Sequence, residues 1–199
     1  MKSNLMVLLT AIATVPGFGE SPRANAHLSV RVLDYVNLSR SDHHEMEDTA
    51  ERVLRSARIP IVFVECYTGG AETGGEACKR EPGSADLFLR IFQPKMAVKG
   101  EQLGYAAMTP EGGVYVTVFI NPQQQKARVA GLTNGAFLGY AVAHEIGHLL
   151  LGPNSHSSVG IMRPVWRPVD EEWMVKRALF FDPGQARAMQ KAVAERLTR

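Results

Sequence analysis

The sequence lacks the features that mark several broad classes of protein. Acidic and basic residues nearly balance, with a formal net charge of +2 over 199 residues, and no five basic residues are consecutive. This argues against a nucleic-acid-binding surface. No Gly-x-Ser-x-Gly element and no glycine-rich phosphate loop is present, so the usual signals of a serine hydrolase or a nucleotide-binding protein are missing. We find no internal repeat or low-complexity linker.

Long hydrophobic runs are also scarce. One apolar stretch, "LMVLLTAIATV", lies between an N-terminal lysine and a "RANA" end. A basic start, about ten apolar residues and a small-x-small end predict a secretory signal peptide over 1–26 and a single mature domain over 27–199. A membrane anchor needs about 20 apolar residues, and Pro16 and Gly17 interrupt this run earlier. We expect a secreted protein, or a periplasmic one in a Gram-negative cell, with no anchor after cleavage.

Cysteine occurs only twice, as Cys66 and Cys78, on either side of a loop rich in Gly and Glu. In an oxidising compartment the two are expected to pair. Closing so short a loop stabilises by roughly 3 kcal/mol in the chain-entropy model. Two free buried thiols are the alternative. Two cysteines alone make a poor zinc site, so neither is assigned to a metal.

Strands are expected in the first part of the mature chain. Segments rich in β-branched and aromatic residues, bounded by turn signals, occur at 27–37, 59–66, 85–92 and 112–120. An amphipathic helix capped by Ser41 or Asp42 separates the first two. A strand, a helix and then several strands predict a mixed sheet with a helix packed on it.

Helices dominate the second part of the chain. A long apolar helix is predicted to have Asn134 as its N-cap and to end at Gly152, which is followed by proline. Further helices are expected over 170–181 and after Asp182. The predicted fold is therefore α+β: a mixed, twisted sheet of about four strands packed on the early helix and a central helix, with a helical C-terminal part.

The central helix carries the pattern "HEIGH", with His144 and His148 four residues apart. Side chains at i and i+4 share one helix face, so both imidazoles can reach one ion without distorting the backbone. Neutral imidazole is a good zinc ligand. Glu145 leans off this face and can act on water as a general base. A polar helix carrying these residues by chance is the alternative, and the glycine stop and following histidine favour the zinc site.

The third zinc ligand is less directly indicated. Catalytic zinc usually has three protein ligands and an open position. His156, in the loop after Gly152, is one candidate, whereas the neutral amide of Asn154 is a weak zinc ligand. The rival is a glutamate on a later helix, as in thermolysin-like enzymes: Glu171 or Glu172. Both also fit the acidic first turn of a helix.

The stretch "HEIGHLLLGPNSHSSVGIM" resembles the metzincins, zinc peptidases with His-Glu-x-x-His-x-x-Gly-x-x-His followed by a methionine turn. It is most similar to matrixin-type members and related secreted bacterial proteins. The resemblance implies a metzincin-like fold and these site residues: ligands His144, His148 and His156, base Glu145, and Met162 as an apolar floor rather than a ligand. The loop departs from the pattern, because its glycine comes one residue later and its third histidine two residues later.

The resemblance also implies where a substrate lies. In metzincins the last strand before the active-site helix borders the cleft, and a peptide adds to it as a further strand. Here that strand is "GGVYVTVFI", which we expect to be a sheet edge, and the substrate-binding candidates are Tyr115, Val116, Thr117 and Val118. An ordinary edge strand is the alternative. The candidates for oxyanion stabilisation are Tyr105, Tyr115 and Tyr140.

The sequence therefore predicts a secreted, monomeric, zinc-dependent endopeptidase that acts on peptide or protein substrates. One catalytic Zn²⁺ is the expected cofactor, with Glu145 as general base. A zinc-bearing protein that binds a protein or glycan without turnover is the alternative from another class. Glu145 argues against it, because a purely structural site does not need that carboxylate. Hydrolysis of a non-peptide amide is the third possibility.

Overall fold

The computed structural model describes residues 27–94, 103–107, 114–120 and 130–198, so the predicted signal peptide at 1–26 lies outside the described residues. Six strands form one sheet: β1 Leu28–Asp34, β2 Ile61–Thr68, β3 Ala71–Glu72, β4 Asp86–Phe92, β5 Gly104–Ala107 and β6 Tyr115–Phe119. The helices are α1 Arg40–Ser56, α2 Gly75–Lys79, α4 Asn134–Leu151, α5 Pro168–Val175 and α6 Pro183–Arg196. None of these helices is long and apolar enough to cross a bilayer.

The strands lie in the order β3-β2-β1-β4-β6-β5. The four central strands β2, β1, β4 and β6 are parallel, and the two short outer strands β3 and β5 run antiparallel to their neighbours. The sheet is therefore mixed, and the α+β prediction is confirmed. Sequence reasoning found the four central strands and missed the outer two, which have two and four residues and no clear alternation.

One expectation about the sheet is wrong. The strand containing Tyr115, Val116, Thr117 and Val118 was expected at an edge, but β6 lies between β4 and β5. Thr117 pairs with Arg90 on one side and with Tyr105 on the other, so both sides of the strand are occupied. The edge beside the long helix is β5. The physical reason is that "GYAA" in β5 carries too little hydrophobic pattern to be detected as a strand.

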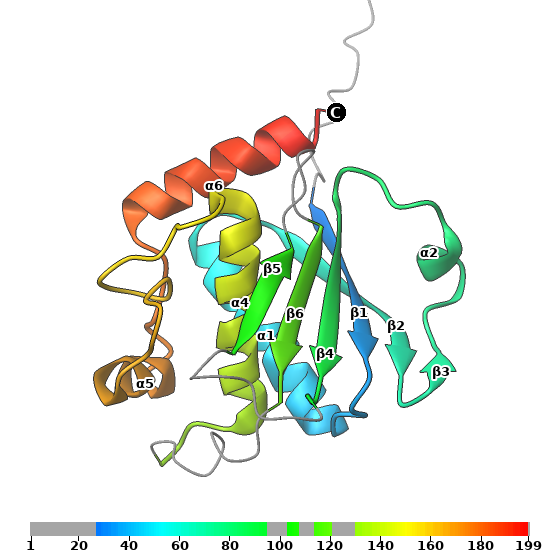
Figure 1. Ribbon diagram of the computed structural model, residues 1–199, viewed down its shortest axis with the longest axis horizontal. Helices are drawn as coiled ribbons and strands as arrows, with labels where there is room; N and C mark the ends of the chain where they lie inside the picture. The colour runs from blue at the N-terminus through cyan, green and yellow to red at the C-terminus, as the bar shows by residue number, and fades with distance from the viewer. Residues whose placement is uncertain (1–26, 95–102, 108–113, 121–129, 199) are drawn as a thin grey trace, which may run out of the picture.

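Helices α1 and α4 pack against one another and against one face of the sheet (Figure 1). Two glycines of α4 allow the close approach. A Cβ on Gly139 would lie 2.5 Å from the Met46 carbonyl oxygen, and one on Gly135 would lie 2.5 Å from that of Asp42. Side chains at alternate positions of β1 and β4 fill the space beneath the helices: Leu28, Val30, Val32, Leu87, Leu89 and Ile91, all at most 1% exposed.

The helix termini follow the expected chemistry with small shifts. Helix α1 begins after Ser39, whose hydroxyl accepts from the Asp42 amide, rather than after Ser41 or Asp42. Helix α4 begins after Thr133, one residue before the expected cap. These shifts of one to three residues are typical, because neighbouring polar residues compete for the same capping role.

The C-terminal part is helical as expected, with one difference. Helix α6 begins after Asp182, which caps it. Helix α5 ends at Val175, short of the predicted 170–181, because Arg177 takes a left-handed φ of 57°. The chain then runs extended, and the Phe180 carbonyl accepts a hydrogen bond from the Ile161 amide. This extended segment ties the C-terminal part to the loop after α4.

The Cys66–Cys78 disulfide is present, as predicted. It joins β2 to the short helix α2 and so pins the loop between them. Arg31 of β1 adds to this anchor by donating to the carbonyls of Cys78 and Arg80. This loop lies at the β2 end of the sheet, far from α4 (Figure 1).

Candidate metal centre

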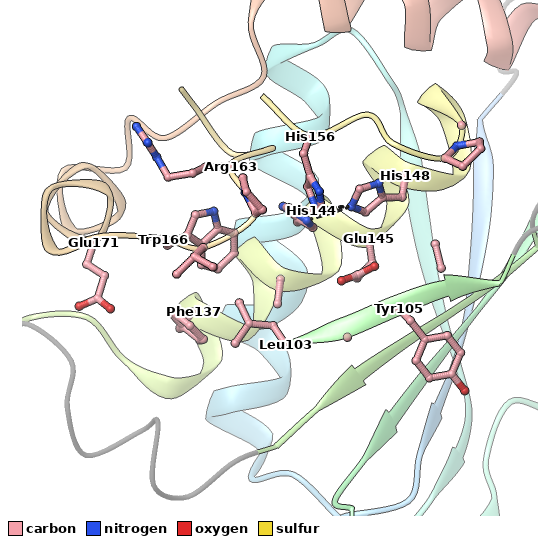
Figure 2. A pocket seen from close by; sticks show the side chains of 17 residues that line it. Leu103, Tyr105, Phe137, His144, Glu145, His148, His156, Arg163, Trp166 and Glu171 are labelled. Carbon is pink, nitrogen blue, oxygen red and sulfur yellow. Dashed lines mark hydrogen bonds between the residues drawn. The ribbon is translucent and has the colours of Figure 1, made fainter. Parts of the chain in front are cut away.

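Helix α4 presents His144 and His148 on one face, and the following loop brings His156 to the same point. The Nε2 atom of His148 lies 3.1 Å from Nε2 of His144 and 3.1 Å from Nε2 of His156. Figure 2 shows the three rings turned toward one another. We call these residues the histidine triad. The structure thus brings together the three residues that the sequence singled out as ligands.

Hydrogen bonds at the other ring nitrogens orient the triad. Nδ1 of His144 lies 2.7 Å from the Ile161 carbonyl oxygen, and Nδ1 of His148 lies 2.9 Å from the Ser155 hydroxyl. A carbonyl can only accept, so His144 carries its proton on Nδ1 and its Nε2 lone pair faces the triad. The Ser155 hydroxyl can accept from His148 in the same way. Such outer hydrogen bonds are the usual support of metal-ligating histidines.

The triad fits a zinc ion. If His148 Nε2 carried a proton, it could donate a good hydrogen bond to only one acceptor. This nitrogen nevertheless lies 3.1 Å from the Nε2 atoms of both His144 and His156, an arrangement that a shared cation explains better. Three imidazole nitrogens bound to zinc at about 2.0–2.1 Å in tetrahedral geometry lie about 3.3 Å apart. The separations of 3.1 Å are close to that spacing. The donor set therefore fits a three-histidine zinc site.

Burial keeps the two helical histidines neutral. It is the main reason why the pKa of His144 and that of His148 are both lowered to about 4; the neighbouring imidazoles act in the same direction, and the hydrogen bond to the Ile161 carbonyl opposes the shift at His144. A metal ligand must be unprotonated to bind. At neutral pH these two side chains therefore need to lose no proton before they coordinate a cation.

The lengthened loop reaches the triad through two unusual backbone conformations. Gly152 ends α4 with a φ of 90°, and Asn154 takes a left-handed φ of 60°. Asparagine is one of the few non-glycine residues that adopt this conformation readily. Ser155 then bonds to His148, and His156 follows directly into the cluster. Ser155 is a residue that sequence reasoning missed, since no pattern marks a loop serine as the support of a helical histidine.

Met162 packs against α4 on the side of Gly147. It is fully buried, and a Cβ on Gly147 would lie 2.7 Å from its sulfur and 2.8 Å from a ring carbon of Phe181. A mid-helix glycine costs about 1 kcal/mol relative to alanine. Here the missing side chain makes room for Met162 and Phe181, which explains why a glycine stands in the middle of this helix.

Glu145 lies beside the triad, between α4 and β5. It is 5% exposed, and burial raises its pKa to about 8. A Cβ on Gly104 would lie 3.0 Å from the Glu145 Cγ and 3.1 Å from its Oε1, so the carboxylate lies directly against the edge strand. Figure 2 shows this carboxylate below the histidine rings, on the side of β5. Its pKa lies in the range where a carboxylate can both take up and release a proton near neutral pH.

The triad and Glu145 open into a cavity of about 590 Å³. One wall is β5 with the preceding Leu103, and the opposite wall is the segment from Arg163 to Trp166. Trp166 donates from its indole nitrogen to the Ile161 carbonyl at 3.0 Å and meets the Phe137 ring edge-on. The Ile161 carbonyl therefore holds both a cavity wall and His144 in place.

The glutamate rivals lie elsewhere. Glu171 lines the cavity but is not close enough to the triad to share a metal ion with it. Among the described residues, Glu172 neither lines the cavity nor joins the triad. Both lie in α5, where Glu171 belongs to the acidic first turn. The geometry favours His156 as the third ligand.

Most residues that the sequence suggested for substrate binding or oxyanion stabilisation lie away from the cavity of the triad. None of Tyr115, Val116, Thr117 and Val118 lines the cavity. Tyr105 lines it, but its hydroxyl accepts from Arg90 and points away from the histidines (Figure 2). Tyr140 is fully buried and donates to the Met174 carbonyl. No tyrosine hydroxyl of the described residues is placed to reach the triad.

No family model and no curated protein matches this sequence. A solved structure does: the crystal structure of an archaemetzincin from Methanopyrus kandleri matches with a TM-score of 0.51, covering 87% of this chain and 98% of that chain at 14% identity. The fold is metzincin-like. At this identity the likeness establishes the arrangement of strands and helices. The chemistry that this metzincin-like fold can support depends on its own side chains, above all the triad and Glu145.

Proposed function

We propose that the protein is a secreted, zinc-dependent endopeptidase. One observation carries the proposal: three Nε2 atoms converge beside a buried carboxylate, in a cavity bordered by a sheet edge. Binding of a metal would require only the triad. The adjacent carboxylate and the open cavity are what a hydrolase needs in addition.

His144, His148 and His156 would hold the zinc ion, each through Nε2. Bound zinc supplies Lewis acidity, which polarises a carbonyl oxygen and lowers the pKa of water. The Ile161 carbonyl and the Ser155 hydroxyl keep two of the rings in the required orientation. These hydrogen bonds already restrict the rotation of the two imidazole rings, so that less side-chain entropy is lost when the metal binds.

Glu145 would move the proton. Its carboxylate oxygen accepts a proton as water attacks the peptide carbonyl, and then delivers that proton to the amine nitrogen as the C–N bond breaks. Burial without a partner charge raises its pKa, whereas a nearby cation favours the ionised form. The residue can therefore be ionised before the attack and protonated after it.

The outer edge of β5 would bind the substrate backbone. Gly104 to Ala106 line the cavity, and this strand is the sheet edge on that side. An extended peptide can add there as a further strand, so that backbone hydrogen bonds give affinity with little dependence on sequence. This assigns to β5 the role that the sequence had assigned to β6.

The first test compares the protein with its Glu145→Gln variant. The wild type should bind about one zinc and cleave a denatured protein or a peptide library in a zinc-dependent way. The variant should keep zinc and lose about 10³-fold in kcat, as expected for removal of a general base. Unchanged turnover would remove Glu145 as the base, and a wild type that binds zinc without cleaving any peptide would support the non-catalytic alternative.

Export and oligomeric state complete the proposal. The N-terminal pattern supports cleavage after Ala26, and N-terminal sequencing of the protein recovered outside the cytoplasm tests this directly. Sizing of the mature protein should give the mass of a monomer. Protein retained in the cytoplasm with Met1 intact would contradict secretion.

A further inference from the structure

The edge strand β5 carries one large side chain. Three of its four residues are glycine or alanine, and Tyr105 is the exception. On the side of α4, Gly104 leaves room for Glu145, since a Cβ there would lie 3.0 Å from the Glu145 Cγ. Successive side chains of a strand point to opposite faces of the sheet. Tyr105 therefore lies on the face that α1 and α4 leave uncovered, and Figure 2 shows its ring directed away from the histidines.

Tyr105 is 41% exposed, yet several contacts hold its ring. The Nη2 atom of Arg90 donates to the Tyr105 hydroxyl at 3.1 Å, and the guanidinium carbon lies 5.9 Å from the centre of the ring. The ring of Phe119 packs against the same tyrosine, with the ring centres 5.9 Å apart. Arg90 is held in turn, because its Nε donates to the Thr117 hydroxyl at 3.1 Å and its guanidinium lies over the Tyr115 ring. A side chain that is already ordered loses little conformational entropy when a ligand packs on it.

The backbone of β5 determines where a bound peptide meets this ring. The Phe119 amide donates to the Leu103 carbonyl at 2.7 Å, and alternate residues of an antiparallel strand bond to the neighbouring strand. The backbone of Tyr105 is therefore turned toward β6, whereas that of Ala106 is turned toward the outer edge, where a peptide can pair with it. A strand that adds there continues the pleat of the sheet. The peptide residue opposite Tyr105 thus points to the same face, with the Cβ atoms about 4.5–5.5 Å apart.

This position lies close to the catalytic group. Glu145 lies against Gly104, the neighbour of Tyr105, so a peptide carbonyl attacked beside Glu145 lies opposite the same part of β5. The peptide residue that meets Tyr105 is therefore only a few residues from the bond that is cut. Pairs of aromatic side chains on facing strands are among the favourable cross-strand contacts. The small residues of β5 offer no comparable contact to the other side chains of the peptide.

We propose that Tyr105 is a specificity-determining residue, which selects an aromatic side chain at the substrate position opposite it. Arg90 is the positioning residue that holds the Tyr105 ring. This inference rests on the proposed peptidase function and on the binding of substrate along β5. It gives Tyr105, whose hydroxyl lies away from the triad, a role in recognition in place of one in oxyanion stabilisation.

The test uses peptides that carry Phe or Ala in turn at successive positions on either side of the cleaved bond. At one position the wild type should favour Phe by about fivefold in kcat/KM, the upper end for a cross-strand aromatic pair, mainly through KM. Tyr105→Ala should abolish the preference at that position and leave those at other positions unchanged. Tyr35→Ala is the matched control: it removes a tyrosine of similar exposure that lies outside β5 and does not line the cavity, and the preference should remain.

The role of Arg90 is tested by a double-mutant cycle. Arg90→Gln and Tyr105→Phe each remove one partner of the hydrogen bond that holds the ring, so each should reduce the preference for Phe to about twofold. In the Tyr105→Ala background, Arg90→Gln should cause no further loss, because Arg90 acts through the ring. Zinc affinity should be the same in all these variants. A further loss in the double variant would overturn Arg90 as the positioning residue.

Binding to the zinc-loaded Glu145→Gln variant separates the two proposals. Fluorescence anisotropy of the same peptides should show the preference for Phe without turnover, and adding Tyr105→Ala should abolish it. A preference for Phe that is equally strong with and without Tyr105, or no preference at any position, would overturn the role of Tyr105 and leave the peptidase function intact. Binding that favours Phe through Tyr105, together with a wild type that cleaves nothing, would overturn the peptidase function and leave β5 as a peptide-binding edge.

Discussion

Two regions of the molecule meet at the triad, and they are held in different ways. Helix α4 is buried along nearly its whole length and is closely packed against α1 through two glycines. The loop from Gly152 to Met162 is more exposed and is held by a few hydrogen bonds, among them those from Ser157 to Met162 and from Ile161 to Phe180. The helix supplies a rigid pair of ligands, and the loop supplies the third.

This difference assigns separate roles to the two regions. Spacing along a helix determines how His144 and His148 lie relative to one another, whatever happens elsewhere. His156 depends on backbone conformations at Gly152 and Asn154 that a small change can disturb. We therefore expect substitutions in the loop to act through metal affinity, and substitutions in the helix to act through folding as well.

The largest expected effect is loss of the loop ligand. His156→Ala should weaken zinc binding by more than about 100-fold, beyond the loss typical of a supporting residue. Glu171→Ala and Glu172→Ala, made as controls, should leave zinc affinity within about twofold, because neither joins the triad. Competition with a zinc chelator measures all three. A larger loss in either glutamate variant would return the third ligand to α5.

The next largest effect is expected from the hydrogen bond that joins the loop to helix α4, between Ser155 and His148. Ser155→Ala removes the hydroxyl 2.9 Å from His148 Nδ1 and should cost about tenfold in zinc affinity, the lower end of the range for such partners. Ser158→Ala is the control, since its hydroxyl makes no hydrogen bond in the described part of the chain. Equal affinities for the two variants would show that the loop carries His156 without help from Ser155.

The same contrast explains what sequence reasoning could reach. His144, Glu145 and His148 follow from helical spacing, which is a local property. The four central strands and the disulfide follow from local hydrophobic pattern and from cysteine count. Each of these depends on few tertiary contacts, and each appears in the structure.

The features that escaped depend on tertiary contacts. The edge strand β5 exists because it pairs with β6, and its four residues show no pattern of their own. Ser155 is important only because the loop turns back on His148. Gly147 is explained by two side chains that are distant in sequence, Met162 and Phe181. Such relationships have no signature in a single sequence, because the partners are far apart along the chain.

A smaller effect is expected where the helix receives the methionine turn. Gly147→Ala should gain about 1 kcal/mol of helix propensity but lose about 1–3 kcal/mol through overpacking against Met162 and Phe181. The net result should be a lower unfolding free energy in zinc-free protein. Gly152→Ala is the counterpart in the loop: space is open there, and the cost arises from a φ of 90°. Denaturant unfolding compares the two. A more stable Gly147→Ala variant would show that Met162 and Phe181 can shift to accommodate the added methyl group at little cost.

The last comparison is the dependence of stability on pH, which separates the two histidines of the helix from its carboxylate. The pKa of His144 and that of His148 are lowered from an ordinary 6.5 to about 4, so the unfolded chain binds more protons between these values. Their contribution is complete above about pH 6.5 and is lost as pH falls through 4.

Glu145 acts in the opposite direction. Its pKa is raised from 4.5 to about 8, so the folded protein binds more protons in that window, and stability is lost as pH rises toward 8. Below pH 6.5 the two histidines outweigh the single carboxylate, and above it the carboxylate acts alone. The midpoint of thermal unfolding of chelator-treated protein should therefore be highest near pH 6.5, and Glu145→Gln should remove the fall on the alkaline side. A fall that persists in the variant would show that a group outside α4 produces it.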